Sequence, residues 1–194
     1  RRRHTRYWRD WSSDVCSSDL LITALGSQWP DASFAGLASP AIGVLSALAH
    51  PEQLGKRVVV VGAEKRGAEA AWYLALSGHT VTLIDSASGF GEDVNIVDRI
   101  VIPRALQSLG VDVHFGCEWV GASGDAAMLR AGNSVLQVGF DSVVNAQGAK
   151  PPDTGVIATW HACASLGFNI GESAGATGVI GATHSGHRMA CRIE

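Results

Sequence analysis

The sequence predicts an α/β fold with a parallel sheet, and three observations support this prediction. RVVVVG (57–62) is a β-branched run, typical of a strand buried on both faces of a parallel sheet. A stretch with helical spacing follows at 63–79, and a second strand, TVTLID, follows at 80–85. Because strands and helices alternate through most of the chain, we expect helices on both faces of the sheet.

The elements predicted before residue 57 are short. LITALGS (21–27) is an apolar run that ends in Gly-Ser, which predicts a buried strand and a turn. Residues 30–55 contain three prolines and predict a connection with one short helix at 41–49. In the helix at 63–79, Ala70 and Leu74 share one face, with Tyr73 as a candidate third member, and Gly78 ends the helix.

The segments after residue 85 continue the alternation. They predict, in order, a polar loop (86–98), a helix from near Pro103 to Gly110, a strand (111–116), a small antiparallel excursion (118–140), a strand closing on Gly148 (140–150), and a strand end, turn and small-residue helix (170–193).

Composition excludes several classes of function. The net charge of −3 combines +2 on residues 1–20 with −5 on the remainder, which has no basic face for nucleic acid. The four cysteines form no CxxC pair, which argues against a disulfide framework and against a metal or cluster site in this chain, and favours a cytoplasmic protein. No apolar run is long enough to span a membrane, so we expect no membrane segment.

The first twenty residues allow three interpretations. RRRHTRYWRDW (1–11) could be an RNA-binding arm, or the stretch could be a disordered extension without function. The interpretation we favour is that DVCSSDL (14–20) resembles a translated end of a short-read sequencing adapter, because Ser-Ser-Asp occurs twice. This hypothesis predicts an artefactual start, a protein that begins near Leu21, and a missing N-terminal part.

The turn GAEKRG (62–67) follows the first strong strand. Gly62 and Gly67 occupy the first and third positions of a GxGxxG motif, with Ala63 after the first glycine. Asp85 lies 23 residues after Gly62, where an acid would meet a ribose hydroxyl; the alternative is a solvated acid at a strand end. The position of the turn between a strand and a helix, the spacing of its glycines and the acid at Asp85 together predict a Rossmann-like dinucleotide-binding unit.

Glu64 departs from the motif, because it stands where the second glycine would let the backbone approach a pyrophosphate. Two interpretations follow: a functional NAD(P)H site, or an altered or vestigial site, which we favour. We expect Lys65 and Arg66 to be exposed charges on the first helical turn.

Four segments then occur in a familiar order: LITALGSQW, GKRVVVVGAEKRGAEAAWYLALSGHTVTLID, FDSVVNAQGAKP and IGESAGATGVIGATHSGHRMACRIE. Residues 21–194 resemble the C-terminal part of the multidomain NADH:flavin oxidoreductases, the class of 2,4-dienoyl-CoA reductase and trimethylamine or dimethylamine dehydrogenase. The resemblance implies an upstream barrel with FMN and a 4Fe-4S cluster. It also implies a domain for FAD or ADP, with a second, NAD(P)H-type domain inserted in it.

The resemblance implies further cofactor-binding residues. Gly26 and Gly148 stand in the two ATG-like segments of the family, here Ala-Leu-Gly and Ala-Gln-Gly. Gly171 and Glu172 match a Gly-Asp pair whose acid hydrogen-bonds the flavin nucleotide, with Glu in place of Asp. The helix ending THSGHRMA is most similar to the amine dehydrogenases, which implies an electron-transfer flavoprotein as a partner.

The domain hypothesis has four parts: an artefactual extension (1–20), the end of the first part of an FAD/ADP domain and a linker (21–56), an inserted NAD(P)-type domain (57–145), and the return segment of the FAD/ADP domain (146–194). We expect part of a flavin-dependent oxidoreductase that is inactive alone; the alternative is a non-catalytic, vestigial nucleotide-binding module. No residue is assigned a catalytic or metal-binding role. His184, His187 and Cys191 are expected on a helix surface or in packing, and Cys117 and Cys163 are expected to be buried.

Overall fold

The computed structural model describes residues 20–91, 94–176 and 178–193. The adapter hypothesis concerns residues that lie almost wholly outside these ranges. The chain divides into two compact units: unit 1 combines Arg1–Ser27 with Pro151–Glu194, and unit 2 is Gln28–Lys150. In the described part of the chain, no helix is long and apolar enough to cross a membrane.

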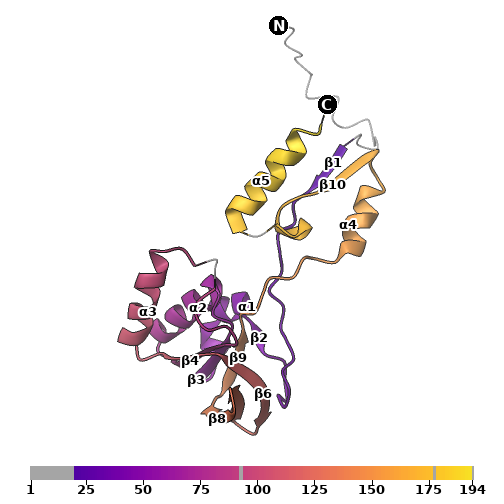
Figure 1. Ribbon diagram of the computed structural model, residues 1–194. Coiled ribbons are helices and arrows are strands. Elements are labelled where there is room, and N and C mark those ends of the chain that lie inside the picture. The colour runs from indigo at the N-terminus through magenta and orange to yellow at the C-terminus, as the bar shows by residue number, and fades with distance from the viewer. Residues whose placement is uncertain (1–19, 92–93, 177, 194) are drawn as a thin grey trace. The chain divides into compact units, whose positions relative to one another are not determined.

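Unit 2 is built on a five-stranded parallel sheet with the order β2-β9-β3-β4-β5 (Figure 1). Its strands are β2 (Ile42–Gly43), β3 (Arg57–Val61), β4 (Thr80–Asp85), β5 (Asp112–Phe115) and β9 (Ser142–Asn145). The β-branched run at 57–61 occupies the centre, where both faces are covered, as the sequence predicted. The strand β2 was not predicted, because two residues carry no hydrophobic period.

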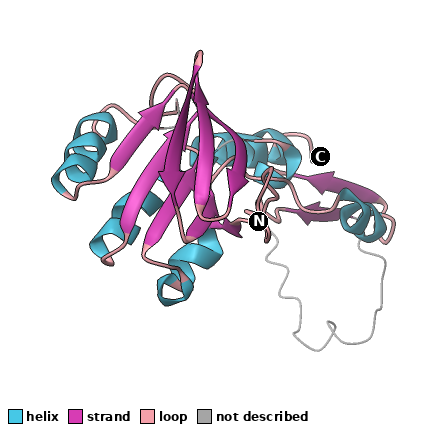
Figure 2. Cartoon of the chain, turned by 90° about the horizontal axis from the view of Figure 1, so that it is seen from below, coloured by secondary structure: helices cyan, strands magenta, loops and turns pink. Residues whose placement is uncertain are grey.

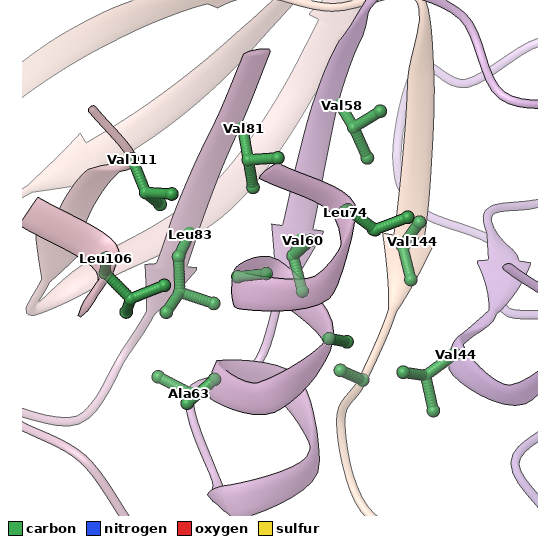
Figure 3. Packing of buried hydrophobic residues seen from close by; sticks show 14 of the residues in the cluster. Val44, Val58, Val60, Ala63, Leu74, Val81, Leu83, Leu106, Val111 and Val144 are labelled. Atoms are coloured by element: carbon green, nitrogen blue, oxygen red, sulfur yellow. The ribbon is translucent and has the colours of Figure 1, made fainter. Parts of the chain in front are cut away.

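Helices α1 (Val44–Ala49), α2 (Lys65–Leu76) and α3 (Asp98–Ser108) pack with one face of this sheet, and the 3₁₀ turn η2 (Pro51–Gln53) follows α1. Val58 and Val60 of β3 pack in one apolar cluster with Leu74 of α2 and Leu83 of β4 (Figure 3). Leu74 and Leu83 are fully buried, which is worth about 1.5–3 kcal/mol for each side chain. The predicted face of α2 is therefore confirmed for Ala70 and Leu74, which are buried, and wrong for Tyr73, which is exposed.

A three-stranded antiparallel sheet packs with the other face, where helices had been expected. Its strands are β6 (Cys117–Ser123), β7 (Ala126–Ala131) and β8 (Ser134–Gly139), in the order β6-β7-β8. Figure 2 draws the strands of the chain in magenta and the helices in cyan. Val59 and Val61, which alternate with Val58 and Val60 along β3, pack there with Leu129. The predicted antiparallel excursion is thus the second layer of unit 2.

Unit 1 contains one pair of parallel strands, β1 (Leu20–Thr23) and β10 (Leu166–Asn169). Helices α4 (Thr154–His161) and α5 (Gly178–Ala190) flank this pair (Figure 1), and the 3₁₀ turn η3 (Gly171–Ala174) follows β10. The α/β, Rossmann-like fold class is confirmed.

The expected start of α3 was wrong by five residues. The helix begins at Asp98 and contains Pro103, whereas the sequence predicted a start near the proline. Asn95 explains the difference, because its Oδ1 accepts hydrogen bonds from the backbone N–H groups of Val97 and Asp98, both 3.0 Å away. The Asn side chain thus satisfies amides that the helix itself leaves unpaired.

The turn between β3 and α2 is a close contact between backbones. Gly62 has φ +109°, and a Cβ there would lie 2.9 Å from the carbonyl of Ala146, which follows β9. A Cβ on Gly67, in the first turn of α2, would lie only 1.9 Å from the Gly62 oxygen. Both glycines of the predicted motif are therefore required by the packing.

Replacing Gly67 with alanine tests this contact. Gly67→Ala should lower the free energy of unfolding by about 3 kcal/mol, because overpacking outweighs the roughly 1 kcal/mol that alanine gains in helix propensity. Urea denaturation measures the difference. The control is Gly89→Ala, at a site with open space for a Cβ, which should change the free energy by less than about 0.5 kcal/mol. Equal stability of Gly67→Ala and wild type would contradict the contact.

An ion-pair cluster ties β3 to the segment that enters β9. Arg57 Nη2 lies 2.7 Å from Asp141 Oδ1 and 2.8 Å from Asp125 Oδ2, and Asp141 Oδ2 accepts the Arg57 backbone N–H. Hydrogen bonds from Arg57 lower the pKa of both carboxyls, and the carboxylates raise the pKa of Arg57.

Asp141→Asn should therefore lower the midpoint of thermal unfolding at neutral pH. The effect should exceed that of Asp125→Asn, because the Asp141 side chain is less exposed, 34% against 75%. A lowered folded-state pKa stabilises the fold above the unfolded-state pKa of about 3.9, and this stabilisation is lost as the pH falls through the folded-state pKa. Melting curves at several pH values should show wild type and Asp141→Asn converging below about pH 4. A constant difference would contradict this role.

Candidate functional site

The carboxyl ends of β3, β4 and β9 meet at one edge of the unit 2 sheet. The chain crosses from β3 to β4 on one side and returns to β9 on the other side, so this edge is a topological switch point. Ligands of open α/β sheets bind at such a point. The sheet order thus brings the Gly62 turn, Asp85 and the segment after Asn145 into one region.

Asp85 connects two of these strand ends. Its Oδ2 accepts the backbone N–H of Ala63 at 2.5 Å, and its Oδ1 accepts that of Ala87 at 2.7 Å. Ala63 is fully buried, whereas Asp85 is half-buried. A carboxylate has about four lone-pair sites, so Asp85 can hold the glycine turn and still accept a ribose hydroxyl.

Glu64 is the N-cap residue of α2, with an extended backbone (φ −61°, ψ 170°), and it is exposed. Its backbone adopts an ordinary conformation, so the missing second glycine causes no strain in the turn. The carboxylate nevertheless adds negative charge beside the start of a helix, the kind of place where a pyrophosphate binds in a dinucleotide-binding turn.

The two basic residues after Glu64 have partners. Lys65 Nζ lies 2.7 Å from Asp98 Oδ2 and 3.7 Å from Glu69 Oε1, and the hydrogen bond to Asp98 raises the pKa of Lys65. The Arg66 guanidinium lies over the Trp29 ring, 4.6 Å from its centroid, a cation–π geometry. The expectation of exposed charges holds for Arg66, whereas Lys65 is partly buried.

A cavity of about 290 Å³ lies at the same edge. It is lined by residues from the connection before β2, the ends of β3 and β4, β6 and the segment after β9: Phe34, Val61, Asp85, Ser86, Cys117, Glu118, Trp119 and Gln147. The cavity places Asp85 and Gln147 beside aromatic side chains. Half of the lining residues are polar or charged, and the volume lies just below the roughly 300–1,000 Å³ that is typical of small-molecule sites.

Gly148 lies near this edge of unit 2, with φ +51° and an exposed backbone. The turn that precedes it contacts Gly62 through Ala146. Gly62, Ala63, Gly67, Asp85 and Gly148 therefore belong to one unit.

The other three predicted residues come together in unit 1. Gly26, with φ +69°, follows β1, and Gly171, with φ +74°, follows β10, so the parallel pairing of these strands places both turns at the same end. Ser27 Oγ donates a hydrogen bond to Glu172 Oε2 at 2.5 Å, which joins the two turns. The Glu172 carboxylate is thus bonded to Ser27, the residue that follows Gly26.

A buried polar network supports this end of unit 1, and the sequence analysis missed it. Ser173 Oγ donates to Asn169 Oδ1 at 2.7 Å and accepts the Leu25 N–H at 3.3 Å. Thr23 Oγ1 lies 3.1 Å from Asn169 Oδ1 and 3.0 Å from His161 Nε2. The signal for it was the presence of polar residues inside two otherwise apolar strands.

His187 and Cys191, at the end of α5, lie outside this network. His187 Nε2 lies 3.8 Å from Cys191 Sγ on the exposed end of α5, and no group of metal-binding residues occurs within residues 20–91, 94–176 and 178–193. Cys117 is buried, as expected. Cys163 is exposed, so its predicted burial was wrong; it lies just beyond α4, and its thiol lies 3.5 Å from the Thr159 carbonyl oxygen.

Asp85→Asn tests the connection between the strand ends. The neutral amide offers one acceptor oxygen in place of two, so Ala63 or Ala87 must lose a hydrogen bond. We expect amide hydrogen exchange at one of these residues to accelerate about fivefold. Asp112→Asn is the control, because Asp112 begins β5, whereas Asp85 ends β4, and the Asp112 carboxylate contacts the His114 ring. Unchanged exchange at both amides would contradict the assignment.

Comparison with known proteins identifies the family of the chain. A family model described as "Pyridine nucleotide-disulphide oxidoreductase" matches residues 10–177. A comparison with curated proteins gives no match.

Several solved structures share the fold. A 2-naphthoyl-CoA reductase in complex with 2-naphthoyl-CoA has a TM-score of 0.78 and 24% identity over 91% of this chain and 27% of its own. Histamine dehydrogenase from Rhizobium sp. 4-9 has a TM-score of 0.73 and 24% identity over 91% of this chain and 29% of its own. A water-forming NADH oxidase from Lactobacillus brevis, bound to NADH, has a TM-score of 0.54 and 21% identity over 73% of this chain and 33% of its own.

The chain thus spans about a third or less of each of these proteins. The family model, in contrast, covers most of the chain, and the Rossmann-like units described above are those expected of its members. The chain belongs to the pyridine nucleotide-disulphide oxidoreductase family, a family of flavin-dependent oxidoreductases.

Proposed function

We propose that the chain is the nucleotide-binding part of a flavin-dependent oxidoreductase of the amine dehydrogenase or dienoyl-CoA reductase kind. Unit 1 holds FAD or ADP, and unit 2 is an NAD(P)H-type domain. The observation that carries the proposal is the meeting of Gly26 with Gly171 and Glu172, far apart in sequence, at one end of the β1–β10 pair. The fold shared with a CoA-ester reductase and an amine dehydrogenase over 91% of the chain supports the class.

In this proposal the cofactor performs the redox chemistry, and the chain binds and orients it. Substrate chemistry belongs to an upstream part with FMN and a 4Fe-4S cluster, so the chain alone does not turn over. The coverage of 27–29% of the two larger relatives supports this division. An electron-transfer flavoprotein would accept the electrons. The free thiols of Cys117, Cys163 and Cys191 favour the cytoplasm.

A second candidate is a non-catalytic nucleotide-binding module, and Glu64 favours it for unit 2. A carboxylate beside the start of α2 repels a pyrophosphate, so unit 2 would keep the fold without the ligand. Asp85, which still holds the turn, would then be structural.

Equilibrium dialysis of the chain against FAD, ADP, NADH and NADPH tests which nucleotides the chain binds. The proposal predicts retention of FAD or ADP and weak retention of NADH and NADPH. Tight NADPH binding together with reduction of bound FAD would contradict the view that unit 2 is vestigial. Failure to retain any of the four nucleotides would contradict the proposal.

Replacing Glu64 tests the cause of weak NADH binding. Glu64→Gln removes the charge at nearly constant volume, and Glu64→Gly also removes the bulk. We expect the Kd for NADH to fall about tenfold in Glu64→Gln, and further in Glu64→Gly. Glu52→Gln, an exposed residue on η2, is the control for a change in net charge. No improvement in either Glu64 variant would show that another feature limits binding.

A further inference from the structure

We propose that Ser27 is a positioning residue, which holds the Glu172 carboxylate where it meets a hydroxyl group of the bound FAD or ADP. This inference rests on the proposed function of unit 1. It assigns a role to a residue that no motif identifies, and it explains how Glu serves at a position where the family resemblance implies Asp.

Ser27 and Glu172 are in direct contact. Ser27 Oγ donates to Glu172 Oε2 at 2.5 Å, a short distance that is typical of a hydroxyl bonded to a carboxylate. Both residues are half-buried, so water competes with the contact only partly. A charge-assisted hydrogen bond is about twice as strong as a neutral one.

Both residues stand on turns that other hydrogen bonds hold together. The Ile170 N–H donates to the Thr23 carbonyl at 2.8 Å, which extends the pairing of β1 and β10 by one residue. The Leu25 N–H donates to Ser173 Oγ, and the Gly171 N–H donates to Ser185 Oγ of α5 at 3.2 Å. The distance between the backbones at 27 and 172 is therefore set by the fold, and the side chains must span it.

The length of the side chain at 172 then decides the contact. Aspartate would withdraw the carboxylate by one carbon–carbon bond, about 1.5 Å, and leave the serine hydroxyl outside hydrogen-bond range. Glutamate reaches the hydroxyl, which fixes one carboxylate oxygen. Serine at 27 and glutamate at 172 thus act as a matched pair.

A double-mutant cycle on FAD and ADP affinity tests the pair. We expect Ser27→Ala and Glu172→Asp each to raise the Kd about tenfold, and the double variant to be no weaker than either single variant. Ser27→Thr, which keeps the hydroxyl, should retain affinity close to that of wild type. Ser46→Ala, which removes an exposed hydroxyl on α1, is the matched control. Circular dichroism and thermal melting identify variants that lose affinity because they lose the fold.

The outcomes separate the two proposals. Additive effects of Ser27→Ala and Glu172→Asp, or wild-type affinity of Ser27→Ala, would overturn the positioning role and leave nucleotide binding by unit 1 standing. If wild type binds neither FAD nor ADP, the proposed function fails, and the role of Ser27 fails with it. If Glu172→Asp binds more tightly than wild type, the matched pair is wrong, because the shorter acid would then be the better ligand.

Discussion

The contact between Gly67 and the Gly62 carbonyl is the constraint on which unit 2 depends. It brings the start of α2 so close to the end of β3 that no side chain fits between them. Gly62, with its positive φ, lies in turn against the carbonyl of Ala146. These backbones fix where α2, β3 and the segment after β9 meet, and the buried valines and leucines on either side follow from that arrangement.

Two glutamates at the candidate sites have opposite consequences. Glu64 lies beside the N-terminus of α2, where the positive end of a helix favours a phosphate and a carboxylate competes with it. Glu172 lies where the Gly26 and Gly171 turns meet, and its carboxylate there can accept a hydrogen bond from a hydroxyl group. In the function we propose, the same charge weakens unit 2 as a pyrophosphate site and lets unit 1 accept a hydroxyl group of FAD or ADP.

Much of unit 2 could be predicted from the sequence, because its signals are local. The β-branched run at 57–61, the spacing of Ala70 and Leu74 and the strand at 80–85 are each readable within a few residues. The start of α3 was wrong because Asn95 accepts the backbone N–H groups of Val97 and Asp98, so the helix begins at Asp98, five residues before Pro103. Helix α4 was missed because its sequence, TGVIATWH, is rich in β-branched residues. The preceding residue, Asp153, caps the helix by accepting the Gly155 N–H, a contact that is seen in the structure.

The contacts of the candidate sites could be predicted less well. Asp85 was identified from its spacing, but its hydrogen bonds to Ala63 and Ala87 depend on the turn geometry. The Ser27–Glu172 pair joins residues 145 apart, and no local pattern predicts such a pair. The packing of β6–β8 on the second face of the sheet likewise depends on the tertiary structure. The sequence of a short antiparallel strand does not indicate which surface it packs against.

The central claim is that unit 1, rather than unit 2, receives the nucleotide. Hydrogen–deuterium exchange of the chain with and without saturating FAD, ADP or NADH tests it most directly. We predict that FAD or ADP slows exchange at residues 23–27 and 169–176, and that NADH leaves residues 62–67 unchanged. Slower exchange at 62–67 with NADH, without any change around Glu172 with FAD or ADP, would contradict the account.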